Sequence, residues 1–236
     1  MKVLVIPDVH LKPRMFKRAA ELIRQGEAKR AVCLMDLADD WNCMFHTDLY
    51  QKTYDAVVSF ARAFPDTLWC WGNHDVCYLW NQRETGYSAF AAGTVCRGLR
   101  ELKEALPDPG QLAFLHRIDG VLFSHAGLCE AFVREYAADL AGEDTDAVIR
   151  RINSLTWTEL WQDLSPIWYR HRYEGGVLYR EKDLLQVTGH TPVAWITRNE
   201  NLIECDVFST RPDGRPIGTE QFLVLDTLTW EYEGMS

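Results

Sequence analysis

Three short apolar runs near the N-terminus constrain the fold more than any other feature of the sequence. They cover residues 3–6, 31–35 and 67–71, and two stretches with apolar residues at helical spacing, about 13–25 and 48–63, separate them. Short strand-like runs that alternate with amphipathic helices predict a parallel sheet with helices packed against it.

The rest of the chain changes from helical patterns to strand patterns. Helical spacing is found at about 95–105, 128–140 and 144–153. Two strand-like runs, 112–116 and 121–124, interrupt these helices and are joined by the turn Asp119-Gly120. The last quarter holds five short runs typical of strands: 184–188, 194–197, 202–206, 222–225 and 229–232. Because no repeat or obvious linker divides the sequence, we expect one α/β domain over residues 1–236.

The composition is that of an ordinary globular protein and excludes several classes. The 236 residues are 47% hydrophobic, which is enough for a sizeable core. The net charge of -9 repels a phosphate backbone, so we expect no non-specific binding of nucleic acid. Seven cysteines without a CxxC pair predict neither a disulfide framework nor a zinc knuckle. No signal peptide and no apolar run of about 18 residues is found, so we expect a cytoplasmic protein without a membrane span.

The three N-terminal runs each end in polar side chains that can bind metal ions. In chain order these are Asp8 and His10, then Asp36 and Asp39, then Asn73 and His74. The carboxyl ends of the strands in an open parallel sheet line one crevice, so we expect these clusters to converge there. Two later runs each end in a histidine near a glycine, Ser124-His125-Ala126-Gly127 and Gly189-His190-Thr191-Pro192.

These motifs, taken in order, resemble those of the calcineurin-like metallophosphoesterase superfamily. They read Asp-x-His, Asp-x-x-Asp, Gly-Asn-His-Asp, His-Ala-Gly and Gly-His-Thr-Pro, and they span positions 8 to 192. The last two are similar to the phosphoprotein-phosphatase-like branch, which includes small bacterial and phage protein phosphatases and symmetrical dinucleoside tetraphosphate hydrolases. The resemblance implies an α/β four-layer sandwich of two mainly mixed β-sheets flanked by helices, with a metal site at the C-terminal ends of the strands.

The resemblance also implies a role for each motif residue. Two metal ions, Mn²⁺, Fe or Zn²⁺, would be held by Asp8, His10, Asp36, Asn73, His125 and His190, with Asp36 bridging. A hydroxide between the ions would attack the phosphorus atom. His74 would protonate the leaving oxygen, and Asp39 would orient the ring of His74.

Two departures from the family pattern affect how phosphate would be bound. Asp40 stands where the branch usually has an arginine that grips the substrate, and Leu11 replaces a glycine that often follows Asp-x-His. Arg170 lies in a Pro-x-Trp-x-Arg segment like that of bacterial members, so we expect it to supply the missing cation, with His171 and Arg172 as weaker candidates. Trp41 and Trp168 are candidates to line a pocket for an aromatic group.

The sequence therefore predicts a dimetal phosphoesterase that hydrolyses phosphomonoesters, either a phosphoprotein or a small phosphate ester. A dinucleoside polyphosphate hydrolase or a phosphodiesterase is the alternative within the same chemistry. A non-catalytic metal-binding scaffold is the alternative from another class, and it would be expected to lack ligands or the general acid. All six proposed ligands, His74 and Asp39 are present, which favours an enzyme.

Overall fold

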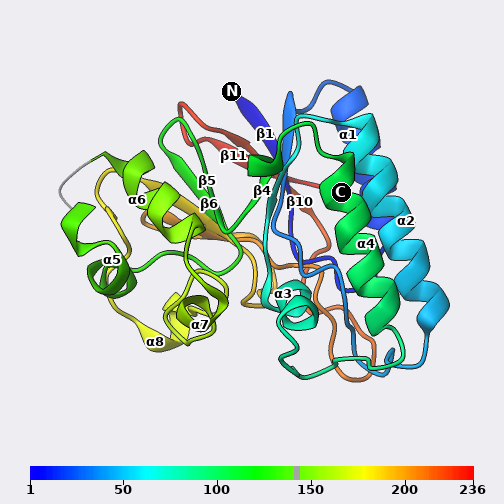
Figure 1. Ribbon diagram of the computed structural model, residues 1–236. Coiled ribbons are helices and arrows are strands. Elements are labelled where there is room, and N and C mark those ends of the chain that lie inside the picture. Colours follow the sequence, from blue (N-terminus) through cyan, green and yellow to red (C-terminus); the bar gives the residue numbers. More distant parts are fainter. Residues whose placement is uncertain (141–143) are drawn as a thin grey trace.

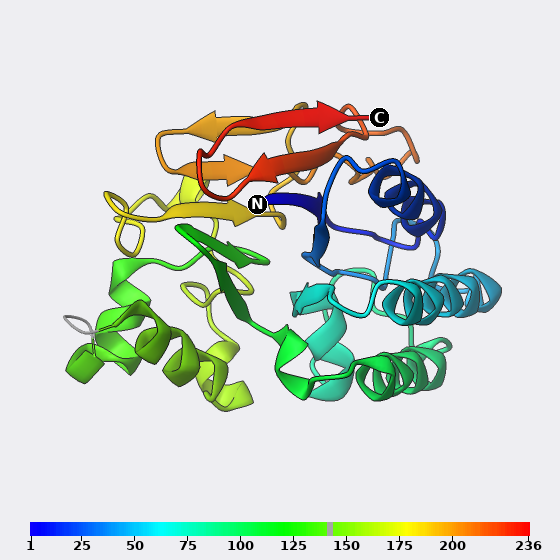
Figure 2. The same ribbon diagram turned by 90° about the horizontal axis from the view of Figure 1, so that it is seen from above.

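The computed structural model describes residues 1–140 and 144–236, which form two β-sheets with helices on their outer sides (Figures 1 and 2). The first sheet has the strand order β11-β10-β1-β2-β3-β4. Its strands are β1 (Lys2–Ile6), β2 (Arg30–Cys33), β3 (Leu68–Cys70), β4 (Leu112–Ala113), β10 (Phe222–Asp226) and β11 (Tyr232–Met235). Strands β1 to β4 run parallel, and β10 and β11 extend the sheet in antiparallel fashion beside β1.

The second sheet has the order β5-β6-β7-β9-β8. Its strands are β5 (Leu115–Ile118), β6 (Val121–Ser124), β7 (Leu185–Thr188), β8 (Thr197–Asn199) and β9 (Leu202–Glu204). Strands β6, β7 and β9 are parallel, while β5 and β8 are antiparallel edge strands. Both sheets are therefore mixed, and each has a parallel centre whose strands end on one side.

Helices cover the outer face of each sheet (Figure 1). Beside the first sheet lie α1 (Arg14–Arg24), α2 (Thr47–Ala63) and α4 (Ala92–Ala105), while α5 (Glu130–Tyr136) and α6 (Thr145–Asn153) lie beside the second. The shorter helices are α3 (Asn73–Leu79), α7 (Trp157–Leu160), α8 (His171–Glu174), and the 3-10 turns η1 (Pro109–Gln111) and η2 (Ala138–Leu140). None of the helices in the described residues is long and apolar enough to cross a membrane.

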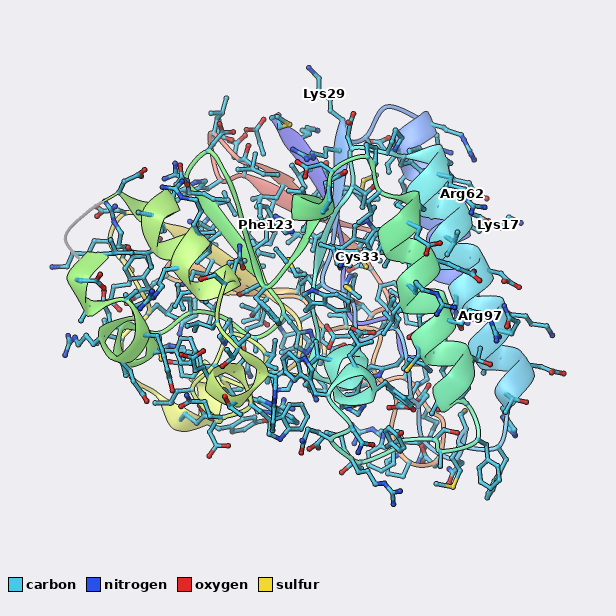
Figure 3. The ribbon with its side chains drawn as sticks, viewed as in Figure 1. Lys17, Lys29, Cys33, Arg62, Arg97 and Phe123 are labelled. Atoms are coloured by element: carbon cyan, nitrogen blue, oxygen red, sulfur yellow. The ribbon has the colours of Figure 1, made fainter. Side chains whose placement is uncertain are left out.

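Three apolar interfaces separate the layers. Val3 and Val5 of β1 face the second sheet and pack with Phe123, whereas Leu4 and Ile6 face the helices. A separate apolar cluster lies between the second sheet and its own helices. Three interfaces define four layers, so the predicted fold class is confirmed. The outward faces of these helices are polar. Figure 3 shows Lys17, Arg62 and Arg97 extending from them into solvent.

The first helix shows how local sequence sets its bounds. Pro13 directly precedes the first residue of the helix, Arg14. Proline suits this position because its fixed φ matches the first turn and its missing N–H would have no partner there. Gly26 follows the last turn with φ 86, a left-handed conformation that costs glycine little.

Some strand boundaries differ from those that the sequence predicts. The run 112–116 does not form one strand, because β4 pairs with β3 in the first sheet while β5 pairs with β6 in the second. Asn153 accepts hydrogen bonds from the backbone N–H groups of Phe114 (3.0 Å) and Leu115 (2.9 Å) where the chain crosses between sheets. The run 194–197 is also placed too early, since β8 is Thr197–Asn199.

Candidate metal centre

Six side chains that the sequence singles out come together at the carboxyl ends of five strands. Asp8 and His10 follow β1, Asp36 follows β2, Asn73 follows β3, His125 follows β6 and His190 follows β7. The first sheet therefore contributes four of these side chains and the second sheet contributes two.

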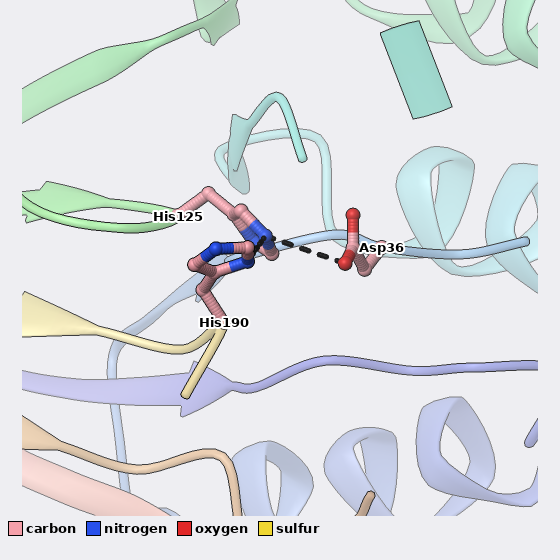
Figure 4. Close-up of side chains that lie close together, drawn as sticks. All are labelled: Asp36, His125 and His190. Atoms are coloured by element: carbon pink, nitrogen blue, oxygen red, sulfur yellow. Dashed lines mark hydrogen bonds and ion pairs between the residues drawn. The ribbon is translucent and has the colours of Figure 1, made fainter. Parts of the chain in front are cut away.

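Asp36 lies between two groups of possible ligand atoms. Its Oδ2 atom is 3.8 Å from His10 Nε2 and 3.3 Å from His125 Nε2. Asp8, His10 and Asp36 form one cluster of converging donor atoms, and Asp36, His125 and His190 form another (Figure 4). Asn73 joins the second cluster, since its Oδ1 atom is 3.0 Å from His125 Nε2. The geometry is that of two adjacent sites that share one carboxylate.

Each of the three histidines has one ring nitrogen turned to a backbone carbonyl. Nδ1 of His10 is 2.9 Å from the oxygen of Asp39, and Nδ1 of His125 is 2.9 Å from the oxygen of Leu34. Nε2 of His190 is 3.0 Å from the oxygen of Trp168. A carbonyl accepts only from a protonated nitrogen, so the other nitrogen of each neutral ring has a free lone pair. The second nitrogen of each ring is the one that faces Asp36 or the neighbouring histidine.

The charges in this region fit a cation. Burial raises the pKa of Asp8 well above its ordinary value, and the carboxylates of Asp206 and Asp36 raise it further. Burial also opposes ionisation of Asp36, but His125, His74 and His10 outweigh it and hold the pKa of Asp36 below its ordinary range. His125 Nε2 and His190 Nδ1 are 3.1 Å apart, and burial lowers the pKa of His190 well below its ordinary value, so Nδ1 of His190 carries a lone pair that a cation can use. Buried carboxylates and facing lone pairs are both stabilised by positive charge, so the donor set fits metal ions.

Two glycines leave room for the carboxylates. A Cβ atom on Gly72 would overlap Oδ1 of Asp36, and a Cβ atom on Gly189 would overlap Oδ1 of Asp8. Asp8 also accepts hydrogen bonds from the backbone N–H of His190, at 3.1 and 2.9 Å. The glycines that precede Asn73 and His190 in their motifs are thus required by close packing of backbone against a carboxylate.

Several of these residues have left-handed backbone conformations. Positive φ angles occur at His10 (40°), Asp36 (42°) and His190 (60°), where a residue other than glycine pays about 1–2 kcal/mol. Leu11 also has a positive φ, 57°, and its side chain is buried. Glycine adopts this conformation without strain, which is why the family often has glycine at this position. In this chain, burial of the Leu11 side chain offsets part of the backbone strain.

His74 and Asp39 form a pair beside the clusters. Nδ1 of His74 donates to Oδ2 of Asp39 at 3.1 Å. Burial lowers the pKa of His74, but Asp36 and Asp39 outweigh it and raise the value to about 9. Tyr50 and Tyr78 both donate to Oδ1 of Asp39, at 2.8 and 2.6 Å. Neither tyrosine belongs to a motif, and Tyr50 falls on the apolar face of a helix, so the local sequence gives no sign of this role.

The family model of calcineurin-like phosphoesterases matches residues 1–215. The chain belongs to this family. Membership implies a metal-dependent hydrolase of phosphate esters, with residues able to hold two ions.

Solved structures agree with this phosphoesterase fold. A cold-active protein-tyrosine phosphatase of a psychrophilic Shewanella species is 15% identical with a TM-score of 0.58, covering 100% of this chain and 80% of that chain. A point mutant of a cold-active protein-tyrosine phosphatase is 15% identical with a TM-score of 0.57, covering 100% of this chain and 80% of that chain. At such identities the likeness concerns the fold. Among proteins with curated functions, none matches the chain in sequence.

A cavity of about 390 Å³ opens beside the clusters of this calcineurin-like phosphoesterase. His74 and Arg170 line it, and NH1 of Arg170 donates to the backbone oxygen of His190 at 2.6 Å. The two weaker candidates are engaged elsewhere, since Arg172 pairs with Glu204 at 2.6 Å and His171 contacts the hydroxyl of Tyr169 at 2.9 Å.

Only one of the two candidate pocket tryptophans lines the cavity. Trp41 forms part of its wall. Trp168 does not line the cavity, and its indole instead packs edge-on against Trp161 at 5.1 Å. The backbone oxygen of Trp168 nevertheless holds the ring of His190, so the residue contributes through its main chain.

Asp40 occupies the usual arginine position of the family branch, and two neighbouring side chains hold its charged carboxylate. Lys12 donates to its Oδ2 at 3.0 Å and Thr210 to its Oδ1 at 2.6 Å. Burial alone would raise the pKa of Asp40, but Lys12 and Thr210 outweigh this effect and lower it. The carboxylate therefore remains charged, and the ammonium of Lys12 reduces its repulsion of an anion in the cavity. The contacts of Lys12 and Thr210 with Asp40 could not be predicted from the sequence, because neither residue belongs to a motif.

Proposed function

We propose that the protein hydrolyses phosphate monoesters with the help of two metal ions. The ligands would be Asp8, His10, Asp36, Asn73, His125 and His190, with Asp36 shared. The observation that carries this proposal is the convergence of three imidazole rings and two buried carboxylates on one region beside a cavity, with one nitrogen of each ring turned to a backbone carbonyl.

The nitrogen and oxygen donors favour Mn²⁺, Fe or Zn²⁺ over metals that prefer sulfur. When bound, such ions lower the pKa of water and offset the charge of phosphoryl oxygens. The backbone carbonyls behind the histidines keep the donor nitrogens aimed at the ions, as outer partners do in other metal sites.

His74 supports the proposal as the group that delivers a proton to the leaving oxygen. Its Nδ1 proton is held by Asp39, so Nε2 is the atom that would hold the second, transferable proton. The carboxylate of Asp39 stabilises the imidazolium form, and the tyrosine hydroxyls in turn hold that carboxylate in place.

Arg170 favours a monoester as the substrate. A monoester dianion carries more charge than a diester, and the guanidinium of Arg170 lines the cavity next to the clusters. Because NH1 is held by the backbone oxygen of His190, the remaining N–H groups have a fixed direction. A phosphate whose oxygens lie near the ions would lie within the same cavity as this side chain.

A second candidate function is cleavage of a phosphodiester or a dinucleoside polyphosphate. Its support is the apolar part of the cavity wall, to which Trp41, Met44, Pro192 and Ile217 contribute. An indole beside a phosphate site is suited to stacking on a nucleobase.

A substrate panel with Mn²⁺ supplied separates the two functions. We expect p-nitrophenyl phosphate and phosphopeptides to be hydrolysed faster than bis-p-nitrophenyl phosphate or diadenosine tetraphosphate. Arg170→Ala should raise KM for the monoesters about tenfold, the loss of about 1.4 kcal/mol from one charged hydrogen bond. Arg172→Ala is the matched control, because that guanidinium is paired with Glu204. Preference for the diester or the dinucleotide would select the second function, and no hydrolysis of any ester would refute both.

A further inference from the structure

Four exposed apolar side chains extend outward from the cavity, and we call Trp41, Met44, Phe45 and Phe90 the mouth patch. Trp41 and Met44 line the cavity, yet they remain 47% and 40% exposed. Phe45 and Phe90 do not line it, and they are 65% and 67% exposed. Their ring centroids are 5.0 Å apart, although the two residues come from different loops. Phe45 directly follows Met44 in the chain, so the mouth patch extends from the cavity wall to the exposed pair Phe45 and Phe90.

The two loops that form the mouth patch are held together by a buried serine. The hydroxyl of Ser88 donates to the backbone oxygen of Met44 and accepts from the N–H of Ala91 at 3.0 Å. The backbone N–H of Ser88 donates to the hydroxyl of Tyr78 at 2.8 Å, and Tyr78 donates to Asp39. These bonds fix the spacing of Phe45 and Phe90 before anything binds. A preformed surface loses little conformational entropy on binding.

We infer that the mouth patch binds the apolar side chains that flank the phosphorylated residue of a protein substrate. This inference rests on the proposed monoesterase function and assigns its substrate class. Exposed contiguous apolar groups mark interaction sites, and this group is continuous with the cavity that would hold the phosphate. A small phosphate ester would fill the cavity without reaching Phe45 or Phe90, so only a longer substrate uses the whole surface.

The charge of the protein supports a polypeptide as the occupant. The net charge is -9, and the exposed Asp48 lies three residues after Phe45. Anionic lipid headgroups and nucleic acids would be repelled by this acidic surface. A peptide with neutral or basic flanking residues meets no such repulsion, and its apolar side chains can cover Phe45 and Phe90.

Paired phosphopeptides test this inference directly. Each pair carries the same phosphotyrosine or phosphoserine and differs only in whether the flanking residues are Leu and Phe or Ser and Ala. We expect kcat/KM of the metal-loaded wild type to be about tenfold higher for the apolar member, as burial of one large side chain predicts. In Phe45→Ser combined with Phe90→Ser, this ratio should fall towards one. Leu228→Ser is the matched control, because Leu228 is 71% exposed in the turn after β10.

Hydrolysis of p-nitrophenyl phosphate separates the failure of this inference from the failure of the proposed function. The double variant should retain wild-type kcat/KM for this small ester, which also shows that it is folded. If the ester is hydrolysed but both peptides of a pair are cleaved equally, the mouth patch is not a peptide site. Two other results would also overturn the inference: a wild-type dimer that the double variant converts to a monomer, or sedimentation with phosphatidylcholine vesicles that the double variant abolishes. If no monoester is hydrolysed, both proposals fail together.

Discussion

Nε2 of His125 and Nδ1 of His190 face each other at 3.1 Å, while the opposite nitrogen of each ring is held by a backbone carbonyl. Two lone pairs at this distance repel each other unless a proton or a metal ion lies between them. The pair therefore gives the clearest physical reason to expect that metal binding stabilises this fold.

Metal removal should lower thermal stability. At a free concentration one hundred times its dissociation constant, Mn²⁺ or Zn²⁺ would stabilise the native state by about 2.7 kcal/mol. Differential scanning fluorimetry after chelation and readdition measures this effect. Asp36→Asn should lose most of the bound metal in elemental analysis, because Asp36 belongs to both clusters. Full occupancy in that variant would show that Asp36 does not bridge.

Loss of the general acid should depend on the leaving group. His74→Asn removes the ring nitrogen that would protonate the leaving oxygen, so turnover of alkyl phosphates should fall by about 10²–10⁴. p-Nitrophenolate leaves without help, so p-nitrophenyl phosphate should be affected far less. Steady-state kcat for both esters provides the comparison, and equal losses would count against this role for His74.

Tyr50 should position Asp39 through its hydroxyl. Tyr50→Phe removes a hydrogen bond to a buried carboxylate, which is expected to cost about 1.5–3 kcal/mol of stability in urea unfolding. It should also lower kcat for alkyl phosphates more than for p-nitrophenyl phosphate, because Asp39 holds His74. Tyr54→Phe is the control one turn further along α2, since the hydroxyl of Tyr54 is buried without a partner and its loss should be neutral or stabilising. Equal effects of the two substitutions would exclude the positioning role.

Gly72 should not tolerate even a methyl group. In Gly72→Ala the new Cβ overlaps Asp36, so metal affinity should fall and the protein should lose about 1–3 kcal/mol of stability. Gly93→Ala, in helix α4 with nothing within 4 Å of its Cβ, should be neutral or gain up to about 1 kcal/mol. Isothermal titration with Mn²⁺ and urea unfolding check both substitutions. Wild-type affinity in Gly72→Ala would show that the loop can shift freely.

His116 should make stability depend on pH away from the metal centre. Burial lowers its pKa to about 4, although its Nε2 contacts the backbone oxygen of Trp69 at 3.1 Å. Between the unfolded value of about 6.5 and pH 4, only the unfolded chain takes up this proton. Stability should therefore fall as pH falls through this window, by up to about 1.4 kcal/mol per pH unit. Urea unfolding of His116→Gln should show a smaller decrease, and exposed His46→Gln serves as the control.

Much of the fold and the centre could be predicted because local sequence determines it. Alternating strand and helix patterns place Asp8, Asp36 and Asn73 at strand ends, and a parallel sheet brings such ends together. Boundaries such as the split of run 112–116 could not be predicted, because Asn153, far along the chain, satisfies the backbone there.

The partners of Asp39 and Asp40 also depend on tertiary contacts. Tyr50 reads as a core residue of a helix, and Thr210 lies 170 residues away from the Asp40 that it contacts. The local hydrophobic pattern predicts neither of these contacts. Arg170 is a candidate only because its segment resembles that of other proteins, and its role in binding phosphate stays a prediction, although the residue lines the cavity.

The distribution of the six converging side chains has a consequence for biosynthesis. His190 lies 182 residues after Asp8, and its backbone N–H donates to that carboxylate. On the ribosome, strands β1 to β3 emerge with four of the donors long before β7 delivers the last imidazole, and β10 and β11 complete the first sheet later still. An ion held by those four donors alone would lack His125 and His190, so the full set of ligands exists only once the two sheets pack together.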